Sequence, residues 1–241
     1  MYKLTNSKTN TPNTKKGVLA IDTASPVVGV AYYDALQQQT WQRRIVQGAD
    51  SELLPVIEGM LQTYDIQSIV VSTGPGAFTG LRVGVSIALG LAFSKNISII
   101  PMSSLFARSL LLCHSQVFVV LDARKNRVYA QLFDTSDSEP KMLCDAVDAD
   151  LQDIIPSQKP FLAVGEGALV YRKQIEENGG MVVTDADISP VKYMAEYGYT
   201  HLELGMDPKN IQMGYVRGPS VTPPKRLGVA VGKEQDMDIK L

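Results

Sequence analysis

The chain has 241 residues, of which 45 % are hydrophobic and 20 % charged, as is ordinary for a folded protein with one large or two small cores. Its net charge is −2. Proteins that bind nucleic acid on their own usually carry a basic surplus that neutralises phosphates, so this charge argues against that function. Two cysteines, two histidines and the lack of a long unbroken apolar run argue against a disulfide framework, a histidine metal motif and a membrane span.

The chain is expected to open with a disordered lead over residues 1–16, which is rich in Thr, Asn, Ser and Lys and has no apolar stretch like that of a secretory signal. The apolar run Val18–Ile21 predicts a buried strand that ends in a turn at Asp22. A helix from Ser51 to Tyr64 is predicted by apolar positions at helical spacing. Further strands are predicted at 27–33, 40–46, 68–72 and 97–100, and further helices at 78–94 and 103–113. This alternation is typical of a mixed sheet covered by helices.

The pattern then restarts, because VVLDARKNRVYAQLFD at 119–134 repeats LAIDTASPVVGVAYYD at 19–34. Asp22 aligns with Asp122 and Asp34 with Asp134 at a constant offset. Helices near 148–155, 167–178 and 189–204 and strands near 160–164 and 181–183 follow the second copy. Two hairpins could be alike by chance, but the elements after each copy favour a duplicated α/β domain. The predicted units are a first lobe at 17–115, a second lobe at 116–218 and an irregular tail at 219–241.

The predicted helix at 78–94 carries bulky apolar residues on two faces, with small residues between them. A helix that lies on a sheet needs only one apolar face, so this helix is either buried on both sides within the monomer or meets another chain. We favour the second interpretation, because leaving several such side chains in water forgoes ~1.5–3 kcal/mol each. The residues predicted to form this interface are Leu54, Ile57, Leu61, Gly80, Leu81, Arg82, Gly84, Val85, Ala88 and Leu89.

The segment STGPGAFTGLR at 72–82 leads into this helix, and its glycines indicate a close approach to the backbone. A phosphate is one candidate, because helix N-termini favour anions. However, Gly80 is one place too far along for a dinucleotide fingerprint, and Pro75 has no N–H to donate. Nucleotide binding by this loop alone is therefore not expected.

Three stretches together, AIDTAS at 20–25, GPGAFTGLR at 74–82 and LDARKNRVY at 121–129, resemble the bacterial TsaB family, also called YeaZ. A late Tyr-Val-Arg at 215–217 fits the same pattern. The match is strong over the first 135 residues and weak from about 136 to 205. The residues that carry the family motif are Asp22, Thr23, Gly74, Pro75, Gly76, Phe78, Thr79, Asp122, Arg124, Tyr129, Tyr215 and Arg217.

The resemblance implies an α/β fold, a duplicated actin-like ATPase-domain (ribonuclease H-like) fold with two related mixed-sheet lobes. It implies a cytoplasmic, non-catalytic subunit of the machinery that makes threonylcarbamoyladenosine in tRNA. Such a subunit pairs through its first two helices with a catalytic TsaD-like subunit or with itself, and a TsaE-like ATPase joins them. ATP and metal are then expected on the partner subunits and none on this chain alone, with tRNA reached only through the complex.

The residues themselves agree with a non-catalytic role. The catalytic relative carries His-x-x-x-His on its first helix, but the corresponding GADSELLP at 48–55 has no histidine, and Asp50 stands where many TsaB chains keep one. No glycine that could cradle a phosphate lies beside Asp22 or Asp122. The loop Gly165-Glu166-Gly167 resembles an adenosine loop, but the glutamate would repel phosphate.

Several single residues keep two interpretations. Asp22 and Asp122 are relics of metal ligands or, as we favour, carboxylates that shape turns. Arg82 either pairs with an acidic residue of a partner or faces solvent. A basic tip is formed by Arg124, Lys125 and Arg127, and it either touches tRNA or, more simply, is a solvated turn. Tyr129 is assigned to the core.

Two other functions compete with the partner-subunit hypothesis. A self-standing actin-like kinase or ATPase is the alternative, and the missing glycine-rich phosphate loop argues against it. A peptidase is the third, and no Ser/His/Asp set or metal-ligand set supports it.

Overall fold

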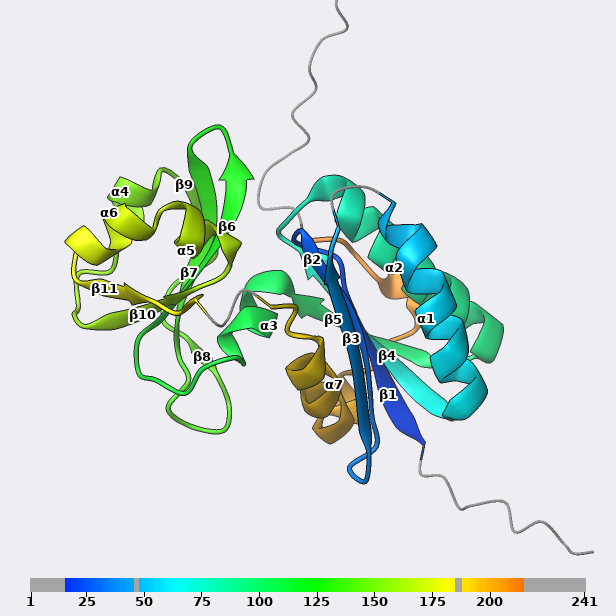
Figure 1. Cartoon of the computed structure of the whole chain (residues 1–241). Helices are drawn as coiled ribbons and strands as arrows, with labels where there is room; N and C mark the ends of the chain where they lie inside the picture. The colour runs from blue at the N-terminus through cyan, green and yellow to red at the C-terminus, as the bar shows by residue number, and fades with distance from the viewer. Residues whose placement is uncertain (1–15, 46–47, 185–187, 215–241) are drawn as a thin grey trace, which may run out of the picture.

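The computed structural model describes residues 16–45, 48–184 and 188–214, which form two α/β lobes (Figure 1). Most of the predicted N-terminal lead, the whole predicted tail and the motif residues Tyr215 and Arg217 lie outside the described residues.

The first lobe is built on a five-stranded sheet with the order β3-β2-β1-β4-β5. Strand β1 lies at its centre, antiparallel to β2 and parallel to β4. Every residue of β1 is buried, because helices cover both faces of the sheet, and this explains its unbroken apolar run. The strands are β1 (Gly17–Asp22), β2 (Val27–Tyr33), β3 (Gln38–Arg44), β4 (Ile66–Gly74) and β5 (Ser98–Ser103).

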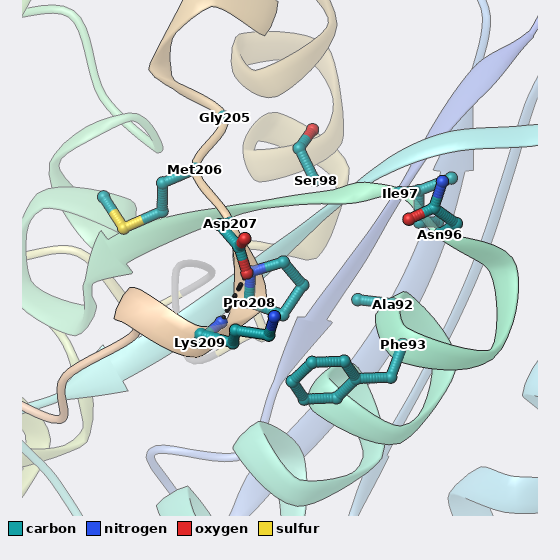
Figure 2. Close-up of a pocket in the computed structure, with 10 residues that line it drawn as sticks. All are labelled: Ala92, Phe93, Asn96, Ile97, Ser98, Gly205, Met206, Asp207, Pro208 and Lys209. Atoms are coloured by element: carbon teal, nitrogen blue, oxygen red, sulfur yellow. Dashed lines mark hydrogen bonds between the residues drawn. The ribbon is translucent and has the colours of Figure 1, made fainter.

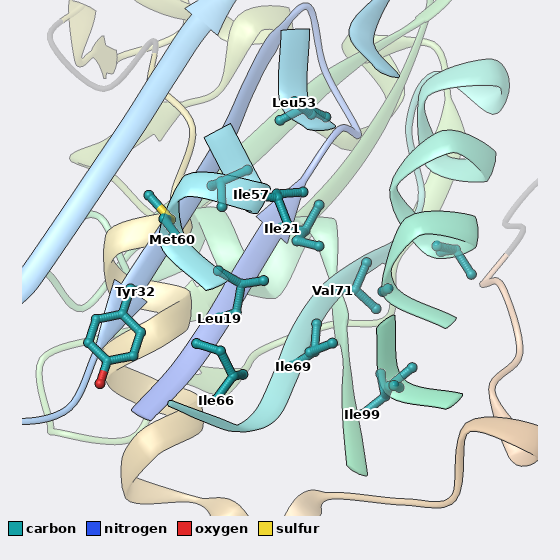
Figure 3. Packing of buried hydrophobic residues seen from close by; sticks show 14 of the residues in the cluster. Leu19, Ile21, Tyr32, Leu53, Ile57, Met60, Ile66, Ile69, Val71 and Ile99 are labelled. Atoms are coloured by element: carbon teal, nitrogen blue, oxygen red, sulfur yellow. The ribbon is translucent and has the colours of Figure 1, made fainter. Parts of the chain in front are cut away.

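The two faces of this sheet have different covers (Figure 1). Helices α1 (Ala49–Thr63) and α2 (Phe78–Lys95) cover one face, where Leu19 and Ile21 pack with side chains of α1 such as Leu53 (Figure 3). Helices α3 (Ser104–Ser109) and α7 (Val191–Thr200) cover the other face, toward which Val18 and Ala20 of the same strand point. Alternate residues of β1 therefore serve two separate apolar clusters.

The second lobe repeats the plan of the first. Its main sheet has the order β11-β10-β6-β7-β8, with β9 also pairing to β7, and read from the other edge this matches the order of the first sheet. The duplication predicted from the two hairpins is thus confirmed at the level of sheet topology. The strands are β6 (Val117–Arg124), β7 (Arg127–Asp134), β8 (Lys141–Met142), β9 (Val147–Ala149), β10 (Phe161–Val164) and β11 (Gly180–Val182). The helices on one face of this sheet are α4 (Leu151–Ile154), α5 (Glu166–Val170) and α6 (Arg172–Glu177).

Helix α3 lies between the two sheets. Ala107 packs against the first sheet, Leu105 packs against the second, and Phe106 contacts both clusters. Ser103 caps the helix by accepting hydrogen bonds from the backbone N–H groups of Leu105 and Phe106. The helix ends at Ser109, short of the predicted 103–113.

Helix α7 does not belong where the sequence placed it. The predicted second lobe at 116–218 includes this helix, but Val191, Met194 and Ala195 pack on the first sheet beside Val18. The packing is close, because a Cβ atom added at Gly198 would lie 2.2 Å from a methyl group of Val70. The chain continues along the first lobe through η2 (Leu202–Leu204) and η3 (Pro208–Asn210), with a backbone bridge between Met206 and Ile99. The prediction was wrong here because the uncovered face of the first sheet needs an apolar cover, which this helix supplies.

Candidate protein interface and the strand-end aspartates

The glycine-rich segment before α2 lies against the chain's own backbone. The N–H of Ala77 donates to the carbonyl of Ala24 at 2.8 Å, and a Cβ atom added at Gly76 would lie 2.4 Å from the same oxygen. Gly74 has a φ of +116° and faces the carbonyl of Gly214, 2.5 Å from where a Cβ atom would stand. The predicted approach of another chain at these glycines is therefore wrong, and the backbone that comes close is internal.

The small residues of α2 are likewise used inside the lobe. Thr23 Oγ1 donates to the carbonyl of Gly80 at 2.8 Å. A Cβ atom at Gly80 would lie 2.2 Å from the carbonyl oxygen of Thr23, and one at Gly84 would lie 2.3 Å from Thr23 Oγ1. These glycines let α2 pack closely on the turn that follows β1. They do not form the predicted crossing point for a partner helix.

Most of the residues predicted to form the interface lie in the core. Ile57, Leu81, Val85 and Ala88 are buried, and Ile57, Val85 and Ala88 belong to the cluster under α1 and α2. Leu61 and Leu89 are half-buried and pack against that cluster. Of the predicted set, only Leu54 and Arg82 are exposed. The rows of α2 were identified correctly, but the sequence alone did not show which row faces the sheet.

The exposed surface of the two helices is defined here as the outer face. It includes Leu54, Pro55, Glu58, Gly59 and Gln62 of α1 and Phe78, Arg82, Ser86, Gly90 and Phe93 of α2. Leu54 is 50 % exposed and Phe93 54 %. The guanidinium carbon of Arg82 lies 3.9 Å from the centre of the Phe78 ring. Helix α2 is long and apolar enough to cross a bilayer, as core helices of soluble proteins also can be. Here one side of α2 packs on the sheet.

Two glycines of the outer face have no explanation within the lobe. A Cβ atom added at Gly59 or at Gly90 would meet nothing within 4 Å. Glycine in a helix interior is less favourable than alanine by up to ~1 kcal/mol. Gly90 could have been singled out from the sequence, because it lies opposite Ala88 and Ala92 on the helix, away from the row that Gly80 and Gly84 share with those alanines.

A hollow of about 380 Å³ lies at the C-terminal end of α2, next to the outer face (Figure 2). Phe93 lies on its α2 side, and Met206, Asp207 and Lys209 lie on the opposite side. Asp207 accepts a hydrogen bond from the backbone N–H of Lys209, which caps η3. The hollow thus has an exposed aromatic ring on one side and charged groups on the other.

Asp22 is fully buried, and both oxygen atoms of its carboxylate accept hydrogen bonds. Its Oδ1 accepts from the N–H of Ala24 at 3.2 Å, which confirms the predicted turn-shaping hydrogen bond. Its Oδ2 accepts from Arg108 Nη2 at 3.2 Å and from Ser189 Oγ at 3.1 Å. The Arg108 side chain is only 2 % exposed, so this is a buried ion pair that joins β1 to α3.

Sequence reasoning missed Arg108 and Ser189. The signal for Arg108 was present, because it is a single charge within the otherwise apolar and small residues SSLFARSLLL at 103–112. A buried arginine requires a carboxylate nearby. For Ser189 the sequence offers no comparable signal.

Asp122, the counterpart of Asp22, lies near the surface of the second lobe. It accepts from the N–H of Arg124 at 2.8 Å and forms an ion pair with Arg124 Nη1 at 3.3 Å, with the arginine side chain 79 % exposed. Burial, together with the charges of Asp122 and Asp150, raises the pKa of Tyr171. The hydrogen bond from the N–H of Arg124 shows that the Asp122 carboxylate shapes its turn, as predicted.

The predicted basic tip is partly neutralised. Arg127 forms an ion pair with Asp148 at 2.6 Å, and Arg124 is paired with Asp122. Lys125 is exposed at the turn. Tyr129 is half-buried against the cluster between α3 and the second sheet, which agrees with its assignment to the core.

The glycines of the adenosine-like loop also serve internal packing. A Cβ atom at Gly165 would lie 2.4 Å from the carbonyl oxygen of Val120, and one at Gly167 would lie 2.8 Å from the backbone of Leu121. They bring α5 onto β6, as Gly80 and Gly84 bring α2 onto the end of β1. Among the described residues, no group of three or more His, Cys, Asp or Glu side chains is arranged to hold a metal ion.

Comparison with known proteins gives three results. A family model described as "TsaD: tRNA N6-adenosine threonylcarbamoyltransferase" matches residues 50–179. A protein of Haemophilus influenzae named "tRNA threonylcarbamoyladenosine biosynthesis protein TsaB" is 35 % identical over 124 residues, and this match covers 46 % of the chain and 51 % of that protein. A Bacillus subtilis protein of the same name is 27 % identical over 191 residues, which is 72 % of the chain and 82 % of that protein.

The fold has a close solved counterpart. YeaZ from Pseudomonas aeruginosa superposes with a TM-score of 0.73 at 19 % identity over 83 % of this chain and 99 % of that one. The likeness confirms the two-lobe α/β fold. The chain matches only about half the length of the H. influenzae relative. The matched family model covers more than half of the chain, and the named relatives agree with one another, so the chain belongs to the TsaD family and, within it, to the TsaB (YeaZ) branch.

Proposed function

We propose that this chain is a non-catalytic subunit of the machinery that makes N6-threonylcarbamoyladenosine in tRNA, and that its outer face binds a TsaD-like catalytic subunit. The relatives' names supply the pathway. In this proposal the protein works in the cytoplasm, a TsaE-like ATPase joins the pair, and tRNA is reached through the complex. A homodimer uses the same face when the partner is absent.

The observation that carries the proposal is the composition of the outer face. Leu54 and Phe93 leave about half of their surfaces in water, and Gly59 and Gly90 face open space on neighbouring helices. Burying an apolar side chain stabilises a complex by ~1.5–3 kcal/mol. Glycines on a helix surface let a second helix approach closely, and this offsets their low helix propensity. A partner helix laid on α1 and α2 would use both features.

The non-catalytic part of the proposal is supported by the two strand-end aspartates. Asp22 is engaged by Arg108, Ser189 and the turn, and Asp122 is engaged by Arg124. Neither carboxylate has a glycine-rich phosphate loop beside it, since the glycines at 74–84 and 165–167 contact the chain itself. ATP and metal are accordingly assigned to the partner subunits.

The test is co-purification of the full chain with a TsaD-like protein. The double variant Leu54→Glu/Phe93→Glu places two charges on the outer face at exposed positions, so the fold is expected to survive. Its matched control is Met181→Glu, which changes a residue that is 63 % exposed at the edge of the second sheet. The proposal predicts that the double variant loses the partner and the control keeps it. If both variants bind like the wild type, the outer face is not the interface.

Calorimetric titration with ATP separates the alternative function. A self-standing kinase or ATPase requires the isolated chain to bind ATP in the micromolar range. The proposed subunit does not bind ATP at that strength on its own.

A further inference from the structure

The edge of a sheet is a row of backbone N–H and C=O groups that can pair with a strand of another chain, so natural sheets shorten, interrupt or cover their edges. Three of the four edges show such a device among the residues that the structure describes. In the second sheet, the edge strands β8, β9 and β11 have only two or three residues each. In the first sheet, β5 contains Pro101, and the N–H and carbonyl of Ile99 pair with Met206 of the returning chain.

Strand β3 forms the fourth edge and shows none of these devices (Figure 1). Its seven residues pair with β2 in one continuous register, and no proline interrupts them. Every residue of β3 is exposed except Trp41, which is half-buried. The two charged residues, Arg43 and Arg44, lie together at one end, so the stretch 38–42 is a neutral and open edge.

The directions of the backbone groups of β3 follow from the residue after it. The N–H of Ile45 donates to the carbonyl of Pro26 at 2.8 Å, so the backbone of Ile45 faces β2. Because these directions alternate along a strand, the odd-numbered residues of β3 face β2 and the even-numbered ones face away. The N–H and C=O groups of Thr40 and Gln42 therefore point away from β2, where no described strand pairs with them.

We propose that β3 pairs antiparallel with β3 of a second copy of this chain, about a two-fold axis at Trp41. In this pairing Thr40 exchanges hydrogen bonds with Gln42 of the second copy, and Gln42 exchanges them with Thr40 of that copy. The two first-lobe sheets then join into one continuous sheet. Such an interface is isologous, so it closes on a dimer and leaves no further β3 edge open.

The polar side chains of β3 fit a second copy as the occupant of this edge. Pairing about Trp41 places Gln38 opposite Arg44 of the second copy and Gln39 opposite its Arg43. The amide oxygen of a glutamine accepts a hydrogen bond from a guanidinium group, so each arginine meets a complementary side chain and no like charges face each other. An axis at Arg43 would instead bring two arginines opposite each other, which is unfavourable. The charges at one end of β3 thus select the full-length antiparallel register.

Trp41 lies at the centre of this pairing. Its ring packs against the apolar cluster under α1 and α2 and is half-buried there. Because Trp41 is an odd-numbered residue, it forms a non-hydrogen-bonded pair with Trp41 of the second copy, in which the Cα atoms lie at ~4.5 Å. The two rings then lie side by side on the same face of the joined sheet, and cross-strand aromatic pairs of this kind stabilise antiparallel sheets.

Sedimentation equilibrium of the full chain tests the pairing separately from the outer face, since none of the outer-face residues named above lies on β3. The starting chain carries Leu54→Glu/Phe93→Glu, which removes a dimer formed through the outer face, and it should still dimerise. Adding Thr40→Pro removes an N–H that points away from β2 and should raise the dissociation constant of the dimer at least about tenfold. Thr40→Val keeps this N–H and should dimerise like the starting chain. A starting chain that is monomeric at about 0.1 mM, or equal dimerisation of the proline and valine variants, would overturn the proposal.

Disulfide trapping tests the register and does not depend on the folding of the proline variant. Cys113 and Cys144 are replaced by serine, and cysteine is introduced at the exposed positions Gln39→Cys or Arg43→Cys. An equal mixture of the two chains should form a mixed disulfide, because Cα atoms at about 4.5 Å suit that bond. Neither chain should link to itself, because its two cysteines would lie roughly 13 Å apart along the strands. A mixture without the mixed disulfide, or a Gln39→Cys chain that links to itself as fast as the mixture reacts, would overturn the proposal.

Discussion

The two hairpins that begin the lobes share a sequence pattern, yet their turns have different surroundings. After β1, the turn is enclosed: Thr23 bonds to α2, Ala24 bonds to the glycine loop, and Asp22 is buried against Arg108. After β6, the turn projects into solvent, and Asp122 pairs with an exposed arginine. A repeated motif therefore serves packing in one lobe and only local turn geometry in the other. Neither copy leaves its carboxylate beside a phosphate loop.

The largest expected effect is on the free energy of unfolding when Asp22 and Asp122 are each replaced by alanine. Asp22→Ala leaves Arg108 buried without its carboxylate, and breaking a buried ion pair in this way costs about 3–5 kcal/mol. Asp122→Ala removes a pair whose arginine is 79 % exposed and should cost at most ~1 kcal/mol. Urea unfolding of the two variants measures both free energies.

A second variant shows that the loss comes from the unpaired charge. Asp22→Ala/Arg108→Met should be more stable than Asp22→Ala, since no charge then stays buried alone. Equal losses for Asp22→Ala and Asp122→Ala would show that the two turns do not differ in the way described.

The next comparison is between Gly84 of α2, which lies against Thr23, and Gly90 of the same helix, which faces open space. Gly84→Leu places a side chain against Thr23, where the first added atom already lies at 2.3 Å, and overpacking typically costs ~1–3 kcal/mol. Gly90→Leu enters open space and should keep or raise stability by up to ~1 kcal/mol through helix propensity. Thermal melting measures both changes.

The same pair of variants sharpens the assignment of the interface. Gly90→Leu should weaken co-purification with the TsaD-like protein although it melts normally. Should Gly84→Leu melt like the wild type and lose the partner instead, the small-residue row faces outward and the present assignment of the faces is reversed.

A smaller, pH-dependent effect is expected at Asp34, which directly follows β2, and at its counterpart Asp134, which ends β7. Burial opposes ionisation of Asp34, but hydrogen bonds from the backbone N–H groups of Gln37 and Leu36 outweigh it and lower the pKa of its carboxyl. The carboxylate therefore contributes stability above the ordinary range of aspartic acid, and this contribution is lost as the pH falls through the lowered pKa.

Asp34→Asn replaces charge-assisted hydrogen bonds by neutral ones and should cost about 1 kcal/mol near pH 7. The difference from the wild type should vanish in strong acid. For Asp134, the hydroxyl and N–H of Ser136 lower the pKa, but the site is exposed, so Asp134→Asn should change stability less. Urea titrations at several pH values compare the two, and a loss at Asp34 that is independent of pH would contradict this account.

Much of the fold could be predicted from the sequence because its signals are local. Unbroken apolar runs predicted the central strands, helical spacing predicted α1 and α2, and the repeat predicted two lobes with one strand order. The position of α7 could not be predicted, since its apolar stripe fits any sheet face that lacks a cover. Which of the two sheets α7 covers depends on the packing of the whole fold and not on the local sequence.

The candidate site was predicted less well, for a physical reason. The residues of α2 fall into rows that the sequence shows clearly, but bulky and small rows both suit a sheet or a partner helix. Only the neighbours of each glycine distinguish them: Thr23 lies against Gly84, and no described atom lies near Gly90. The buried pair of Asp22 and Arg108 joins residues 86 positions apart, beyond the reach of local spacing.

The most direct test of the central claim, that this chain supplies a binding face and no reacting group, is threonylcarbamoyl transfer to tRNA in a system reconstituted with TsaD-like and TsaE-like proteins. The account predicts that Asp122→Ala leaves the rate unchanged. It also predicts that Leu54→Glu/Phe93→Glu lowers the rate in step with its loss of binding and recovers at higher concentrations of the variant. A fall of about a hundredfold for Asp122→Ala, or ~2.7 kcal/mol in the barrier, with binding to the TsaD-like protein unchanged, would contradict it.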